Sequence, residues 1–264
     1  MLTRQTGRMA LLRVDFFSDV LEQGTSMTVL LPQHSRTRIG APARGGDTDP
    51  PVLYLLHGLT DDATAWLRYS SIERYAEERG LAVVMPQVHR SMYADEAHGA
   101  PFWTFLSTEL PQVVDSFFRV SRRRADTFVA GLSMGGYGAF RWALRQPERF
   151  AAAASLSGVL DVAARQYGPP VSATDPLMRR VFGDREVAGS DDDLLALLDK
   201  ADPAALPQLW LCCGTSDELY PDSVRFRDGC DTRGVPLTVD FGPGDHQWSY
   251  WDARIRDVIA WLPL

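Results

Sequence analysis

The chain has 264 residues, of which 45% are hydrophobic and 23% charged, the composition of an ordinary globular protein with a sizeable core. Its formal net charge of −7 and pI of about 5.2 argue against nucleic acid or an anionic membrane as the main partner. Chains of this length commonly form one unit, so we expect residues 1–264 to make a single domain.

We expect no targeting or membrane-spanning segment in this chain. Residues 1–20 lack the apolar stretch and small-residue cleavage site of a secretory signal, and no apolar run approaches the roughly 18 residues that span a bilayer. The three cysteines form no disulfide framework, so we expect a cytoplasmic protein, either monomeric or a homo-oligomer. Residues 1–8 are polar and without periodicity, so Met9 is an alternative start to Met1, and we expect residues 1–8 to be dispensable.

Short apolar runs recur along the chain and predict eight strands. The polar, Gly- and Pro-rich segment 33–50 separates the second from the third and predicts a flexible loop. Several runs are apolar throughout, as expected for strands that are buried on both faces. The eight runs are residues 10–17, 26–31, 52–56, 81–85, 127–130, 151–156, 209–213 and 237–241.

Helical periodicity fills most of the intervals between these strands. Ser107 is placed to cap a helix with apolar residues at positions 110, 113, 114, 117 and 118. Residues 135–145 predict a second helix, Asp191–Asp193 precede a third, and a fourth closes the chain. Alternating strands and helices predict an α/β fold: an eight-stranded, mostly parallel sheet with helices on both faces.

The sharpest local signal is Gly131-Leu132-Ser133-Met134-Gly135, which matches the G-x-S-x-G pattern of a nucleophile elbow. The pattern alone is weak, because a merely tight turn can produce it. A predicted strand runs into it and a predicted helix leaves it, which is the context that the chemistry requires. We therefore expect Ser133 to be a catalytic nucleophile.

A serine nucleophile needs a general base, and five histidines are available. In proteins with this elbow the partners follow the serine in the order acid, then histidine, and only His246 lies after Ser133. His89 and His98 lie in a segment that we expect at the rim of the site, where they could touch the substrate. His57 lies just after a strand, and we expect it to support its loop as a neutral imidazole.

The acid should lie between Ser133 and His246, at the end of a late strand. Asp217 fits best, since a strand ends at Cys213 and a Gly-Thr-Ser turn follows it. Its role would be to hold the imidazole tautomer and stabilise the imidazolium. The rivals for this position are Asp161, Asp175, Asp184, Glu218, Asp222 and Asp245.

Acyl transfer places negative charge on an oxygen, which backbone N–H donors must meet. One donor should be the N–H of Met134, directly after the nucleophile. The second should come from the loop after the strand at residues 52–56, where Gly58 permits close approach and the N–H of Leu59 is the candidate.

Two segments after strand ends depart from the strand–helix alternation. We expect residues 94–103 to form a rim and residues 159–198 a small cap over the site, although both could be ordinary surface loops. Trp66, Trp103 and Trp248 are candidate substrate-binding residues that would narrow an acyl pocket. The alternative for each is core packing.

Several segments together resemble the esterase D family of α/β hydrolases, bacterial tributyrin-type esterases in particular, with S-formylglutathione hydrolases as more distant relatives. The resemblance covers residues 9–261, apart from a loop at 33–50 that is longer than the family needs. It implies an α/β-hydrolase fold, the triad Ser133, Asp217 and His246, and oxyanion donors at Leu59 and Met134. The segments that carry it are Leu55-Leu56-His57-Gly58-Leu59, Glu109-Leu110-Pro111, Ala130-Gly131-Leu132-Ser133-Met134-Gly135-Gly136-Tyr137-Gly138, Cys213-Gly214-Thr215-Ser216-Asp217 and His246-Gln247-Trp248-Ser249-Tyr250-Trp251-Asp252.

These features predict a serine carboxylesterase that cleaves small-molecule, short-chain acyl esters through an acyl-enzyme, with no metal and no cofactor. The same residues leave other functions open. An S-formylglutathione hydrolase or other thioesterase, an acyltransferase, and an acetylxylan- or feruloyl-type esterase would share this machinery. A non-catalytic binding module is disfavoured, because a competent residue fills every catalytic position.

Overall fold

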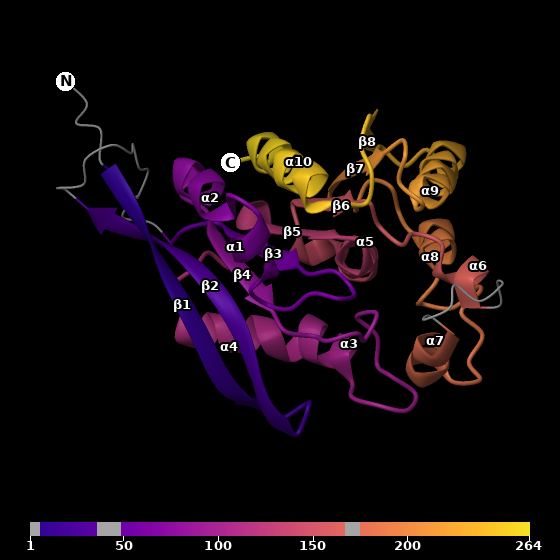
Figure 1. Ribbon diagram of the computed structural model, residues 1–264, viewed down its shortest axis with the longest axis horizontal. Helices are drawn as coiled ribbons and strands as arrows, with labels where there is room; N and C mark the ends of the chain where they lie inside the picture. The colour runs from indigo at the N-terminus through magenta and orange to yellow at the C-terminus, as the bar shows by residue number, and fades with distance from the viewer. Residues whose placement is uncertain (1–5, 36–48, 167–174) are drawn as a thin grey trace.

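An eight-stranded sheet in the order β1-β2-β4-β3-β5-β6-β7-β8 runs through the centre of the protein (Figure 1). The computed structural model describes residues 6–35, 49–166 and 175–264. β1 and β2 form an antiparallel hairpin, β2 pairs antiparallel with β4, and the remaining pairs are parallel. The strands are β1 (Thr6–Ser18), β2 (Gln23–Ser35), β3 (Val52–Leu56), β4 (Ala82–Pro86), β5 (Thr127–Leu132), β6 (Ala152–Leu156), β7 (Gln208–Gly214) and β8 (Thr238–Gly242).

The predicted fold class is confirmed. The observed strand bounds differ from the predicted ones at the β1–β2 hairpin. β1 begins at Thr6, so residues 6–8 belong to the sheet, where they pair with residues 33–35 of β2. Residues 1–5 lie outside the described chain, and the dispensability of residues 1–8 stays a prediction. The hairpin extends through polar residues because backbone bonds to the partner strand form whatever the side chain. The remainder of the expected loop, residues 36–48, is also outside the described chain.

Helices cover both faces of the sheet, and each face has its own apolar core. Residues of α4, α5, α8 and α9 contribute to one core, and residues of α1, α2 and α10 contribute to the other. In Figure 1, α2 and α10 lie side by side, and they are in contact. The helices are α1 (Ala65–Tyr69), α2 (Ile72–Arg79), α3 (Phe102–Thr104), η1 (Phe105–Glu109), α4 (Leu110–Phe117), η2 (Arg124–Asp126), α5 (Met134–Arg145), η3 (Pro147–Arg149), α6 (Val162–Gln166), α7 (Asp175–Phe182), α8 (Leu194–Lys200), α9 (Tyr220–Arg233) and α10 (Trp248–Trp261).

The helix expected to begin at Ser107 begins earlier. α3, the π-helical turn η1 and α4 follow one another without a break, so Ser107 is buried inside the helical run and does not cap it. The aromatic residues Phe102, Trp103 and Phe105 are buried, and this burial extends the helix at its N-terminal end. At α8 the expected acidic cap is present, since the Asp193 carboxylate accepts the N–H groups of Leu195 and Ala196.

The two segments that we expect at the rim and cap are packed against each other. The N–H of Ala97 donates to the carbonyl of Val181 (2.7 Å), and Arg180 forms an ion pair with Glu96 (2.9 Å). Residues 159–198 begin beside Ser133, because the N–H of Val159 donates to the Ser133 carbonyl (3.2 Å). A buried ion pair between Arg141 on α5 and Asp192 also ties this segment to the body of the protein.

Across the described residues, no helix is long and apolar enough to cross a membrane. In the same part of the chain, no group of three or more His, Cys, Asp or Glu side chains is arranged to hold a metal ion. All three cysteines are buried and free, and burial raises the pKa of the Cys213 thiol to about 12.

Candidate active site

Ser133 sits on a strained turn between β5 and α5. Its φ of 53° lies in the left-handed region that residues with side chains rarely adopt. The turn is possible only because two glycines flank it: a Cβ on Gly131 would collide with the Gly135 backbone, and one on Gly135 would lie 2.5 Å from the Leu56 carbonyl oxygen. This geometry holds the serine hydroxyl at the end of β5, next to the first N–H groups of α5.

Ser133, His246 and Asp217 form one chain of hydrogen bonds. His246 Nε2 lies 3.1 Å from Ser133 Oγ, and its Nδ1 lies 2.9 Å and 3.1 Å from the two Asp217 oxygens. The Asp217 side chain is fully buried, whereas the imidazole is about 29% exposed. Burial raises the pKa of Asp217, but hydrogen bonds from His246, the Leu219 N–H and the Ser157 hydroxyl outweigh it and leave the pKa below its usual value. The carboxylate therefore stays ionised at neutral pH and holds the proton of His246 on Nδ1.

The parallel sheet explains why residues far apart in sequence meet here. Strands β5 to β8 are consecutive in the sheet and parallel, so the loops that follow them share one edge. The loops after β7 and β8 are also bonded directly, with the N–H of Ser216 donating to the Gly244 carbonyl (2.9 Å). Ligand sites in such sheets lie at this edge.

The rival acids are engaged elsewhere or point into solvent. Asp161 and Asp222 are both paired with Arg225, and Asp222 also with Arg165. Asp184 and Asp245 are exposed. Glu218 is also exposed, and the side chain of Asp175 lies outside the described part of the structure. Asp217 is thus the acid that the structure brings to His246.

The loop after β3 is held by His57, which is buried. Its Nδ1 donates to the Gly58 carbonyl (2.7 Å), and its Nε2 accepts the Val88 N–H (3.3 Å). Burial lowers the pKa of His57 to about 4, so the ring is neutral, as expected, and both of its nitrogens are occupied. Because carbonyl and N–H of one peptide point in opposite directions, this bond also fixes the Leu59 N–H.

The N–H groups of Leu59 and Met134 have no acceptor within residues 6–35, 49–166 and 175–264. Met134 is the first residue of α5, where backbone N–H groups lack a partner inside the helix and the helix dipole is positive. The geometry therefore leaves two donors unused, one after β3 and one after β5, on neighbouring strands.

The neutral state of His57 predicts a pH effect on stability. An unfolded histidine takes up a proton near pH 6.5, but folded His57 resists it until about pH 4. The unfolded chain therefore binds more protons in this interval, and stability that is fully present above pH 6.5 is lost as the pH falls to 4. We expect about 3 kcal/mol of this loss to disappear in His57→Gln.

Urea unfolding at pH 7 and pH 4 measures this difference. His98→Gln, which replaces an exposed histidine, is the matched control. Parallel pH dependence in His57→Gln and the unmodified protein would show that His57 is not held neutral.

Three tryptophan rings pack in series next to His246. The ring of Trp251 meets the imidazole edge to face at 4.8 Å, Trp248 packs on Trp251 at 5.5 Å, and Trp66 packs on Trp248 at 5.1 Å. Trp66 is buried and donates to the Leu56 carbonyl (3.1 Å), so it supports Trp248 from behind. Trp248 is half-buried and can present its ring to a substrate.

Trp103 is not part of this group. The guanidinium groups of Arg141 and Arg145 lie over its ring, each 4.3 Å from the ring centroid. Arg141 is eight residues beyond Ser133 on α5, about 12 Å along the helix axis. The cation–π contacts with two arginines favour the packing alternative for Trp103, and its binding of substrate stays a prediction.

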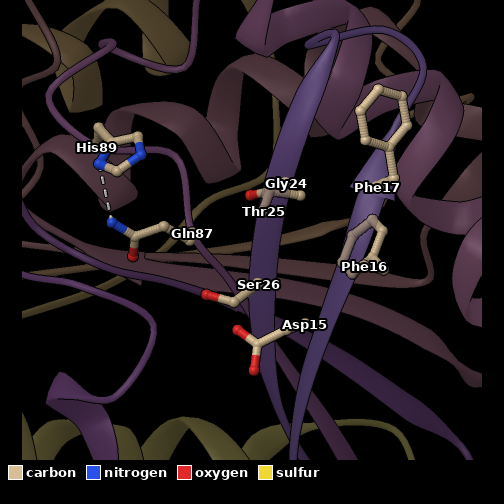
Figure 2. A pocket seen from close by; sticks show the side chains of 8 residues that line it. All are labelled: Asp15, Phe16, Phe17, Gly24, Thr25, Ser26, Gln87 and His89. Atoms are coloured by element: carbon tan, nitrogen blue, oxygen red, sulfur yellow. Dashed lines mark hydrogen bonds between the residues drawn. The ribbon is translucent and has the colours of Figure 1, made fainter.

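A groove of about 520 Å³ opens between the β1–β2 hairpin and the loop after β4. Figure 2 shows Gln87 and His89 on one side of it and the hairpin residues on the other. Gln87 Nε2 lies 3.1 Å from His89 Nδ1, and Gln87 Oε1 accepts the Ala63 N–H (2.8 Å), so this groove borders the segment that follows Gly58. His89 thus lines a cavity, while His98 is exposed against residues 180–183.

Two more residues lie at the site, and of these Ser157 was not predicted from the sequence. Ser157, after β6, is fully buried and has a φ of 47°. Tyr93, also buried, donates its hydroxyl to the His57 carbonyl (2.9 Å). Ser157 lies in a run of small residues that predicts only a strand, so its position became visible only once β6 was placed beside β7.

Comparison with known proteins agrees with this arrangement. Residues 18–262 match the family model described as "Putative esterase". The chain belongs to this esterase family. The esterase is 28% identical to the acetyl esterase of Caldicellulosiruptor saccharolyticus, with 96% of this chain and 98% of that protein covered.

Two solved structures from Staphylococcus aureus are each 35% identical to the esterase over 97% of its chain. One is FphF, a fluorophosphonate-binding serine hydrolase in a substrate-bound structure (TM-score 0.88, 99% of that chain covered). The other is the S-formylglutathione hydrolase FrmB (TM-score 0.84, 100% covered). A ferulic acid esterase shares the fold at 22% identity (TM-score 0.78, 97% of each chain covered). The protein is therefore a serine esterase that acts on carboxylic esters.

Proposed function

We propose that this esterase hydrolyses small-molecule, short-chain acyl esters through a covalent acyl-enzyme on Ser133. The observation that carries the proposal is the continuous chain of hydrogen bonds from Ser133 through His246 to Asp217. The two unused N–H donors at Leu59 and Met134 support it, because they lie at the ends of neighbouring strands beside the nucleophile. We place the enzyme in the cytoplasm, an assignment supported by its three free cysteines.

The reaction would proceed in two halves. Ser133 Oγ attacks the ester carbonyl carbon while His246 Nε2 takes its proton, and the resulting oxyanion accepts hydrogen bonds from Leu59 and Met134. His246 then returns the proton to the leaving alcohol as the tetrahedral intermediate collapses to the acyl-enzyme. Water, activated by the same imidazole, hydrolyses the acyl-enzyme and releases the carboxylic acid. Throughout, ionised Asp217 stabilises the imidazolium.

The preference for short acyl groups rests on the surroundings of His246. We expect the acyl chain to lie against Trp248, whose ring packs on those of Trp66 and Trp251. The relative from Caldicellulosiruptor saccharolyticus is an acetyl esterase, which is in line with a small acyl group. A pocket with rigid walls gains from each added methylene until it is full and then loses through strain.

A series of p-nitrophenyl esters tests this proposal. From acetyl to butyryl, kcat/KM should rise by up to about fourfold per methylene, and it should fall sharply by octanoyl. Trp248→Ala should move the optimum toward longer chains, whereas Tyr69→Ala, which removes an exposed ring that packs on Trp248, should move it less. A maximum at decanoyl or beyond would contradict the short-acyl assignment.

A thioesterase is the second candidate, and the similarity to FrmB favours it. Turnover of S-formylglutathione and of p-nitrophenyl acetate by the same preparation separates the two. A kcat/KM for the thioester that exceeds the ester value by more than tenfold would make the thioester the better substrate class. Added acceptor alcohols in the same assay show whether the acyl group is transferred to an alcohol in place of water.

A further inference from the structure

Ser157 occupies an unusual position for a serine. It follows β6 directly, it is completely buried, and its φ of 47° is one that residues with side chains rarely adopt. Its N–H donates to the Cys212 carbonyl of β7 (2.8 Å), which fixes the backbone of the turn. A strained and buried polar residue persists only where its surroundings hold it in place, and such residues cluster at functional sites.

The hydroxyl of Ser157 connects two groups that contact His246. The indole Nε1 of Trp251 lies 3.2 Å from Ser157 Oγ, and an indole N–H can only donate, so the hydroxyl accepts this bond. Its own hydrogen remains free to donate, and Ser157 is one of the groups whose hydrogen bonding holds the pKa of Asp217 below its usual value. The Cys213 thiol is also within reach, but an ionised carboxylate is the stronger acceptor.

Both partners of Ser157 determine where the imidazole lies. Asp217 binds Nδ1 of His246, and the Trp251 ring meets the imidazole at 4.8 Å. Asp217 also accepts the Leu219 N–H (2.8 Å), so Ser157 completes the set of donors around the buried carboxylate. One hydroxyl from β6 thereby links the loop after β7 to helix α10.

We propose that Ser157 is a positioning residue, which orients the Asp217 carboxylate and the Trp251 ring and through them aligns the His246 imidazole with Ser133. The proposal rests on the function proposed above, since it needs Asp217 and His246 to act in catalysis. Ser157 itself touches neither Ser133 nor a substrate in this scheme.

Ser157→Ala tests the role of the hydroxyl. Loss of a hydrogen bond to a charged group should lower kcat by roughly 10- to 100-fold, with little change in KM. Ser155→Ala is the matched control: Ser155 is equally buried two residues earlier, on β6, and its hydroxyl has no partner among the described residues. Ser157→Gly removes the hydroxyl but relieves the strained φ, so it should lose as much activity as Ser157→Ala while unfolding at a higher temperature. Recovery of kcat in Ser157→Gly would mean that backbone disturbance, not the lost hydroxyl, caused the effect.

A double-mutant cycle separates positioning through Asp217 from a general structural role. If Ser157 acts through the carboxylate, Ser157→Ala should cost less than threefold in an Asp217→Ala background. An equal loss in both backgrounds would overturn the proposal, as would unchanged kcat in the single variant. The downfield proton NMR signal of His246 Nδ1–H provides a readout without substrate, and it should shift or broaden in Ser157→Ala and not in Ser155→Ala. If Asp217→Ala alone kept full activity, the proposed catalytic function would fail, and that outcome is distinct from a failure of the Ser157 proposal.

Discussion

Replacing Ser133 with alanine should lower ester hydrolysis by about 10⁴- to 10⁶-fold while the protein stays folded. Ser133 is the only hydroxyl shown within hydrogen-bonding distance of His246 among the described residues, so no neighbour can take over the attack. Alanine has the same backbone restriction as serine at the φ of 53°, so the melting temperature should change little. Initial rates with p-nitrophenyl butyrate, together with thermal unfolding, measure both effects.

The activity that should remain in Ser133→Ala comes from the oxyanion donors and from substrate binding, which the substitution leaves in place. A fluorophosphonate probe supplies an independent check, because it should label the unmodified esterase and not the Ser133→Ala variant. Retention of a tenth of the rate would show that the nucleophile is a different residue.

Asp217→Asn should lower kcat by about 10⁴-fold, although it changes the shape of the side chain very little. The Asp217 carboxylate holds the proton of His246 on Nδ1, so that Nε2 is free to accept the proton of Ser133. An asparagine amide can donate to Nδ1 instead, which places the ring proton on Nε2 and removes the base. The loss should therefore appear in kcat, with KM nearly unchanged.

Asp245→Asn is the control for this experiment. Asp245 adjoins His246 in sequence, but it is exposed and accepts a hydrogen bond from the Gln247 side chain. The kcat of Asp245→Asn should therefore stay close to that of the unmodified enzyme. Equal losses in both variants would indicate that general negative charge near His246, not the Asp217 bond, supports catalysis.

The buried strands were predictable because they carry a strong signal. β3, β4, β5 and β6 are buried along their whole length, and unbroken apolar runs mark such strands in the sequence. The hairpin was harder, since β1 is an edge strand with alternating exposed residues, and its first residues are polar. The start of α3 was missed for a different reason: tertiary burial of aromatic residues, not local capping, begins that helix.

The chain order predicted that Ser133, Asp217 and His246 would meet. Strands β5 to β8 are parallel, so the loops that directly follow them lie at one edge of the sheet. Chain order says nothing about side chains that meet from neighbouring strands, which is why Ser157 was missed. It also does not show which side chains surround a given ring. Trp103 and Trp248 look alike in sequence, but two arginines of α5 enclose the first, and the second lies beside Trp251.

The separation of Ser133 and His246 along the chain affects the stage of folding at which activity can arise. They are 113 residues apart. His246 follows β8, which is the last strand in the sequence and lies, only partly buried, at the edge of the sheet. A chain that has assembled the sheet only as far as β6 can form the elbow of Ser133, yet it has no base. Partly folded copies, including those still being synthesised, would therefore be inert toward esters. Under the proposed mechanism, hydrolysis should begin only after the final strand and helix have docked.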